Sequence, residues 1–158
     1  MTLLRTEGVA LVDGAETFDG RRRATDCFDW AGALGVGPSR GFNRVVPGTV
    51  GTVARPHVRD ELQVELQWRL NGHYLTDGSM QPAGARDRVD AHLDGLLGFL
   101  DGAAGRQLQL RRFNVAGDST TVDATFKAHG QIRVLSPTIY ELAILLAVPS
   151  GLVARPSA

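Results

Sequence analysis

Residues 45–70 read VVPGTVGTVARPHVRDELQVELQWRL, and the second half of this stretch decides the fold class. Apolar and polar side chains alternate there without a break from residue 62 to residue 70. An alternation with period two places every second side chain on the same face, so it predicts a half-buried β-strand. The side chains expected on its core face are Leu62, Val64, Leu66, Trp68 and Leu70.

The segment before this strand has the composition of a hairpin or of a bulged turn. Two short runs rich in β-branched residues, 44–46 and 49–54, lie on either side of Pro47-Gly48, a pair that is typical of tight turns. Residues 32–41 are rich in glycine and indicate a loop. We therefore expect the whole range 21–44 to form a loop or an arm.

Residues 82–101 have the pattern of one amphipathic helix. Apolar residues recur there at spacings of three and four, which gives a single apolar stripe. The stripe consists of Ala85, Val89, Leu93, Leu96, Leu97 and Leu100, and we expect Leu93 and Leu97 to lie in the core. Gly95 and Gly98 each weaken a helix by about 1 kcal/mol relative to alanine, and we interpret them as positions of close backbone packing.

Strand patterns return after the helix. Apolar and polar residues alternate over residues 107–111 and 122–129, with Phe126 expected in the core. Residues 140–148 are apolar on both faces, which predicts a central strand or one that protein covers on both sides. Residues 149–158 read as a turn-like C-terminal tail. This order predicts one α+β domain over residues 1–158, a mostly antiparallel β-sandwich or barrel with one flanking α-helix.

Composition narrows the classes of function. The 17 basic residues balance the 17 acidic ones, which argues against a nucleic-acid-binding protein because such a protein needs a basic face. The single cysteine, Cys27, excludes an internal disulfide, and we expect it to be buried. The first residues lack the apolar run of a signal peptide, and the apolar stretch 142–149 is too short to span a membrane. We therefore expect a soluble chain, made in a cytoplasm, without a membrane anchor.

No motif in the sequence indicates catalysis. The glycine-rich residues 35–41 lack the strand, helix and lysine that accompany a phosphate-binding loop. His57, His73, His92 and His129 are scattered singly and have no zinc-ligand spacing. No serine lies in a nucleophile-elbow pattern. We therefore predict that the chain is not an enzyme and that it has no catalytic residue, cofactor or metal.

The segment 40–51, RGFNRVVPGTVG, resembles a motif near the start of the distal tail proteins of siphophages and of related minor tail proteins of actinobacterial phages. The resemblance continues in the same order over about residues 1–150. Its further parts are Arg55-Pro56, Asp60-Glu61, the strand 62–70, Asp77-Gly78, the helix segment 93–97 and Val148-Pro149. Residues 24–37 depart from the family pattern. Larger distal tail proteins also carry a further C-terminal domain, which often binds carbohydrate.

This resemblance implies the phage tail-tube fold, a β-sandwich flanked by a helix. It implies a subunit of a hexameric ring that surrounds the DNA-conducting lumen of a long non-contractile tail. Its partners would be its own copies and other tail proteins, and DNA would pass only transiently through the lumen. Such a subunit is assembled in the cytoplasm of the host bacterium and ends in the virion tail. The departures leave open whether the ring is distal, part of the tube, or an upper-end adaptor or terminator.

We expect the contacts of such a subunit with its neighbours to involve arginines and one tyrosine. These residues are Arg21, Arg22, Arg23, Arg40, Arg55 and Tyr140. The triplet 21–23 has two interpretations, a solvated turn or an electrostatic contact with an acidic neighbour or with DNA in the lumen. Two other classes stay open for the whole chain: a β-barrel that binds a small apolar ligand, and an enzyme of unknown class. Thermal stabilisation by an apolar compound would favour the first of them.

Overall fold

An antiparallel sheet of eight strands forms the centre of the computed structural model, which describes residues 3–35, 39–40, 44–45, 52–53, 58–103 and 107–153. The strands follow the order β2-β1-β9-β10-β12-β8-β3, and β11 pairs with β12 beside this path. Their bounds are β1 Gly8–Asp13, β2 Glu16–Asp19, β3 Thr25–Asp29, β8 Leu62–Asn71, β9 Gln107–Phe113, β10 Ser119–His129, β11 Arg133–Ser136 and β12 Ile139–Val148. The prediction of an α+β fold that is mostly antiparallel β is therefore confirmed.

The two ends of this sheet curl toward each other and nearly close a barrel. Arg21, just after β2, forms an antiparallel bridge with Asp26 of β3. The amide of Cys27 donates to the carbonyl of Gly20 at 2.8 Å, and the amide of Gly20 donates to that of Val9 at 2.9 Å. A Cβ at Gly20 would lie 2.6 Å from both the Cys27 Cβ and the Val9 carbonyl oxygen. Only glycine fits at this seam.

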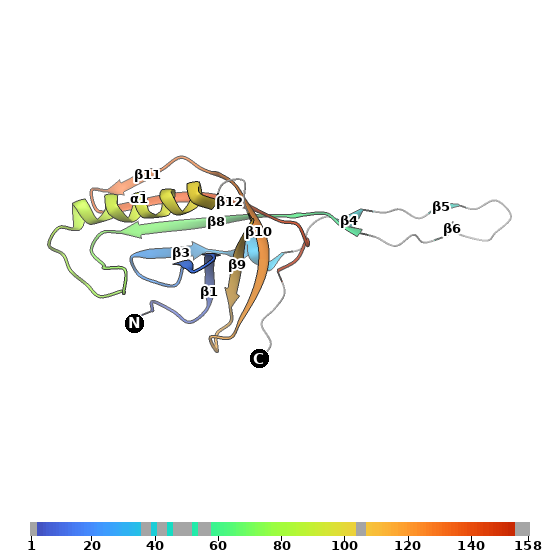
Figure 1. Cartoon of the computed structure of the whole chain (residues 1–158), viewed down its shortest axis with the longest axis horizontal. Helices are drawn as coiled ribbons and strands as arrows, with labels where there is room; N and C mark the ends of the chain where they lie inside the picture. The colour runs from blue at the N-terminus through green and yellow to red at the C-terminus, as the bar shows by residue number, and fades with distance from the viewer. Residues whose placement is uncertain are drawn as a thin grey trace.

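Helix α1 (Ala85–Ala103) runs along β8 and β12 (Figure 1). Gly84 has a φ of +74°, which is not helical, so the helix begins three residues later than the predicted start at Pro82. A Cβ at Gly72 would lie 1.9 Å from the carbonyl oxygen of Ala85. Glycine at the end of β8 therefore lets the start of the helix pack directly against the strand.

The predicted core face of β8 is confirmed. All five of its apolar side chains are buried, and β12 places Leu142 opposite Trp68 and Ile144 opposite Leu66. The position of β12 between β10 and β8 also confirms the prediction of a central strand for residues 140–148. The Phe18 ring packs edge-on against Trp68, with the ring centroids 5.5 Å apart. The interior of the sheet is filled by side chains.

The prediction that Leu93, Leu97 and Phe126 lie in the core was too strong. All three are only partly buried and pack against the edge of the core. The face of the helix that packs against the core instead carries Val89, His92, Leu96, Phe99 and Leu100. His92 can occupy this face because its Nε2 donates a hydrogen bond to the carbonyl of Tyr74 at 2.9 Å.

Within the described chain, Gly95 and Gly98 do not serve the close backbone packing that we expected. A Cβ built on either glycine meets nothing within 4 Å among the described residues beyond the helix's own backbone. The two glycines lie on the exposed side of α1, so no close packing within the chain requires them.

The predicted loop over 21–44 was also wrong in part. Residues 25–29 form β3, which pairs with β8 and brings the buried Cys27 into the core. A 3-10 helix, η1 (Ala31–Leu34), then packs on β8, where a Cβ at Gly32 would lie 3.1 Å from the amide nitrogen of Glu65. The first part of the C-terminal tail is also packed, because Val153 is buried. Residues 154–158 lie outside the described part of the chain.

Two short strand pairs are described between η1 and β8, and we call the segment that contains them, residues 39–59, the arm. Strand β4 (Ser39–Arg40) pairs with β7 (Val58–Arg59), and β5 (Arg44–Val45) pairs with β6 (Thr52–Val53). These pairings confirm the predicted hairpin, whose turn at Pro47-Gly48 lies outside the described residues. Figure 1 shows β5 and β6 beyond β4 and β7, on the side that faces away from the barrel.

Candidate functional site: an apolar groove backed by arginines

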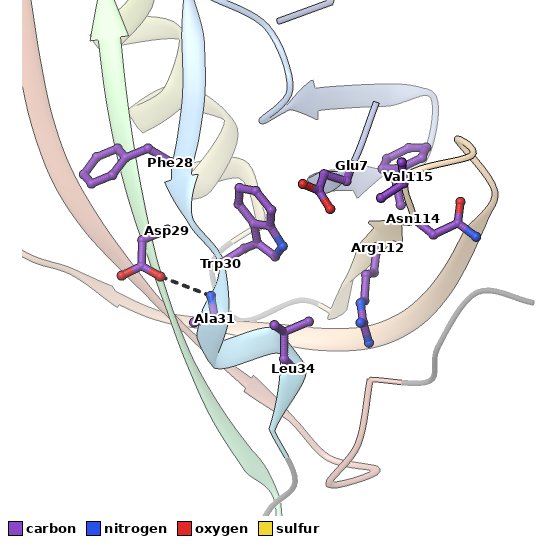
Figure 2. Close-up of a pocket in the computed structure, with 10 residues that line it drawn as sticks. Glu7, Phe28, Asp29, Trp30, Ala31, Leu34, Arg112, Asn114 and Val115 are labelled. Atoms are coloured by element: carbon purple, nitrogen blue, oxygen red, sulfur yellow. Dashed lines mark hydrogen bonds between the residues drawn. The ribbon is translucent and has the colours of Figure 1, made fainter. Parts of the chain in front are cut away.

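A groove of about 510 Å³ opens between the end of β3 and the turn that joins β9 to β10 (Figure 2). We call it the corner groove. It is lined by Glu7, Phe28, Asp29, Trp30, Ala31, Leu34, Arg112, Phe113, Asn114 and Val115. Three separate segments of the chain therefore form it: the residue before β1, the β3–η1 corner, and the end of β9 with the β9–β10 turn.

The β3–η1 wall exposes large apolar side chains. The pairing of β3 with β8 is irregular between Cys27 and Asp29, and such a bulge redirects the side chain of the extra residue, here Phe28. Phe28 is 37% exposed and Leu34 is 52% exposed. The Asp29 carboxylate accepts a hydrogen bond from the amide of Ala31 at 3.1 Å, which fixes the corner where the strand passes into η1. This wall is therefore held in place while its apolar side chains face solvent.

The opposite wall is a tight turn. The amide of Asn114 donates to the Asp118 carbonyl at 2.9 Å, and Gly117 takes a φ of +89° that suits glycine. The hydroxyl of Thr6 donates to the Val115 carbonyl at 2.7 Å and so ties this turn to the N-terminal segment. The side chain of Val115, at 73% exposed, faces the solvent.

Arginines pack against the aromatic rings in and beside this groove. The Arg21 guanidinium lies 3.4 Å from the centre of the Phe113 ring and forms an ion pair with Asp19 at 3.0 Å. Arg5 lies 4.7 Å from the centre of the Trp30 ring and pairs with Asp26.

A third arginine makes the same kind of contact. Arg69 lies 4.7 Å from the centre of the Phe28 ring and binds Glu141 at 2.6 Å. A cation over an aromatic face is attracted by the ring, and each of the three arginines also has a carboxylate partner. The groove therefore has an apolar surface with neutralised charges behind it, which suits a protein contact better than acid–base chemistry.

Three of the arginines that we expected to contact neighbouring subunits already make contacts within their own chain. Arg21 is engaged by Phe113 and Asp19, Arg22 donates to the Thr76 carbonyl, and Arg23 lies 5.5 Å from the centre of the Tyr74 ring. The triplet therefore holds the β2–β3 connection against neighbouring loops, which neither interpretation of the sequence anticipated.

The other predicted contact residues have different outcomes. The hydroxyl of Tyr140 donates to the Asp90 carboxylate at 2.8 Å, which joins β12 to α1 and raises the pKa of Tyr140. Arg40 belongs to β4, but its side chain lies outside the described part of the structure, and so does the whole of Arg55. Their roles between subunits stay predictions.

Two titratable side chains inside the fold, Cys27 and His92, are held in their neutral forms. Burial raises the pKa of the Cys27 thiol far above its ordinary value and lowers the pKa of His92. Across the described residues, no group of three or more His, Cys, Asp or Glu side chains is placed to hold a metal ion. None of the described helices is long and apolar enough to cross a membrane.

The corner groove was not predicted from the sequence. Phe28 and Leu34 lie in the range that the sequence assigns to a loop, Val115 lies between two predicted strands, and the bulge that exposes Phe28 depends on pairing with a distant strand. Comparison with known proteins adds no relative, since no family model and no curated protein matches the chain.

Proposed function

We propose that this chain is a structural subunit of a long non-contractile phage tail, built on the tail-tube fold and without a catalytic role. It would form a ring, of six copies, around the DNA lumen. Its most specific assignment is the distal tail protein, which joins the tube to the adsorption apparatus. A tube subunit or an upper-end adaptor or terminator would use the same kind of ring.

The observation that carries this proposal is the arm. Within the described residues, its strands pair with one another and with no strand of the eight-stranded sheet. The arm sequence contains Phe42 and five valines, so it has apolar side chains to cover. A paired arm that leaves its own barrel can bury these side chains on another molecule, and in a ring that molecule is the next copy.

The corner groove supports the same proposal. A closed ring uses heterologous interfaces, in which one patch of a subunit meets a different patch of the next. Exposed apolar side chains that gather in one place mark contact surfaces on soluble proteins. Phe28, Leu34 and Val115 form such a group on the corner groove, whose described lining includes no residue of the arm.

The filled interior favours a structural role over a ligand-binding barrel. Trp68 is fully buried, and Phe18 lies within 6.0 Å of both Trp68 and Phe99, measured between ring centroids. An apolar ligand inside the sheet would have to displace these rings, whereas a binding pocket is usually largely formed before the ligand enters.

Removal of the arm tests the proposal. In one variant a Gly-Asn turn replaces residues 41–57 and joins β4 directly to β7. We expect this variant to keep the melting behaviour of the barrel but to sediment as a monomer, while the full chain forms a ring. A full chain that stays monomeric at high concentration, and is absent from purified phage particles, would contradict the proposal.

A further inference from the structure

The exposed side of α1 has two glycines that its own chain does not require. Gly95 and Gly98 lie one turn apart, and a Cβ at either would meet open space among the described residues. Glycine weakens a helix relative to alanine, so the two positions cost stability without improving the packing of the monomer. A close approach of another backbone would account for both.

Two grooves meet at Gly98. One has a volume of about 460 Å³ and is lined by Glu16, Thr17, Phe18, Gly95, Gly98 and Phe99. The other has a volume of about 470 Å³ and is lined by Leu97, Gly98, Leu100, Asp101, Phe126 and His129. We call Gly95, Gly98 and these two grooves the glycine face of α1. Aromatic rings line both grooves, so an extended segment that crosses the helix at Gly98 could place apolar side chains on either side.

The glycine face is acidic. Asp94, Asp101 and Glu16 lie on or beside it, and among the described residues neither groove has an arginine or lysine in its lining. The C-terminal end of a helix carries a partial negative charge, which basic side chains usually offset. The last turn of α1 has no basic residue, and Asp101 adds a further negative charge there. A cation from outside this face would stabilise it.

The arm has the complementary charge. Residues 39–59 contain 4 of the chain's 17 basic residues, all arginines, and none of its 17 acidic ones, which leaves 13 basic against 17 acidic residues elsewhere. The same segment supplies the valines that would fill apolar grooves.

We propose that the arm of one copy docks across the glycine face of α1 on a second copy. The arginines of the arm pair with Asp94, Asp101 and Glu16, and its apolar side chains enter the two grooves. The absence of a Cβ at Gly95 and Gly98 lets the extended backbone lie against the helix. This inference rests on the proposed function in one respect, since the ring supplies the second copy of the chain.

The corner groove is a poorer receptor for the arm. Its lining contains Arg112 as well as Glu7 and Asp29, and the arginines behind it are already paired with carboxylates, so it lacks the one-sided acidic charge of the glycine face. DNA phosphates would also attract the arm, but phosphates do not account for the glycines and acidic side chains of α1.

A charge exchange between two full-length variants tests the docking. One variant carries Arg44→Glu and Arg55→Glu in the arm, and the other carries Asp94→Arg and Asp101→Arg on α1. In the first variant the arm has no net charge, because Arg40 and Arg59 are balanced by the two glutamates, and in the second the glycine face carries two arginines. Each variant alone therefore loses the charge complementarity, whereas a mixture restores opposite signs at the substituted positions. Sedimentation velocity at about 50 mM NaCl, where screening is weak, measures the association of each sample.

We expect each variant alone to associate at least about tenfold more weakly than the unmodified chain, and the mixture to recover most of that loss. Asp87→Arg with Asp123→Arg is the matched control, because it makes the same change of charge at exposed positions outside the lining of both grooves and of the corner groove, and it should alter association less than about twofold. A second variant, Gly95→Ala with Gly98→Ala, changes no charge. It should weaken association while it raises the melting temperature of the monomer.

The outcomes separate this inference from the proposed function. If the unmodified chain forms a ring that the charge variants leave intact, or the mixture recovers nothing, the docking is wrong and the ring stands. If the unmodified chain never associates, both fail. If the arm variant loses binding to a short DNA duplex but associates normally, the arm is a DNA contact and the docking is overturned.

Discussion

Replacement of Gly95 and Gly98 by alanine should stabilise the isolated chain, although it alters no contact within the described fold. Both residues lie inside α1, and nothing among the described residues approaches a Cβ at either position within 4 Å. Alanine in an exposed helix interior is more stable than glycine by about 1 kcal/mol, because glycine loses more backbone entropy on folding. We therefore expect the free energy of unfolding to rise by about 2 kcal/mol for the two substitutions together.

The size of this effect is measurable. For a domain of 150–250 residues, a change of 1 kcal/mol shifts the melting temperature by roughly 2–4 °C, so the double variant should melt roughly 4–8 °C higher. The control is Gly72→Ala, whose Cβ would lie 1.9 Å from the Ala85 carbonyl oxygen. Overpacking of this kind costs about 1–3 kcal/mol, so the control should melt lower.

Thermal unfolding followed by circular dichroism gives both values, in dilute solution where the chain is monomeric. A double variant that melts at the same temperature as the unmodified chain, or below it, would refute the assignment of open space to this side of α1. A Gly72→Ala variant of unchanged stability would refute the close crossing of β8 and α1.

Three other predictions concern the interior. Trp68→Ala should lower the free energy of unfolding by about 3–5 kcal/mol in a urea titration, and a loss below about 1 kcal/mol would mean that the register of β8 is wrong. Burial lowers the pKa of His92, so the unfolded chain binds this proton more readily and stability should fall as pH drops below about 6.5. The melting temperature of His92→Gln should decline less between pH 7 and pH 5, and parallel curves would assign the pH dependence to another group. The Cys27 thiol is buried with a raised pKa, so it should react with a thiol reagent only after unfolding, and rapid reaction in the folded chain would contradict its place in the core.

The sequence predicted the elements whose burial follows a regular period. The alternation through Trp68 located β8 and its inward face, because half-buried strands need apolar side chains at every second position. The apolar run 140–148 likewise indicated a central strand. Strand β3 was missed because Thr25–Asp29 is short and has two aspartates, and Cys27 is its one apolar side chain in the core.

The sequence did not predict how the helix is rotated or where the surfaces lie. His92 was treated as a polar residue when the apolar stripe was assigned from the sequence. In the structure the Tyr74 carbonyl accepts a hydrogen bond from His92, so this side chain can be buried. Leu93 and Leu97 therefore lie at the edge of the core. The corner groove depends on a bulge and a turn that lie far apart in the chain. The glycine face became visible only when the structure showed open space beside Gly95 and Gly98.

The most direct test of the central proposal is an image of the purified full-length chain by electron microscopy at high concentration, with native mass spectrometry of the same sample. The ring proposal predicts particles with six-fold symmetry around an open channel and a mass of about 101 kDa, which is six copies of the 16.9 kDa chain. A single species of 16.9 kDa at every concentration, without ring-shaped particles, would contradict it.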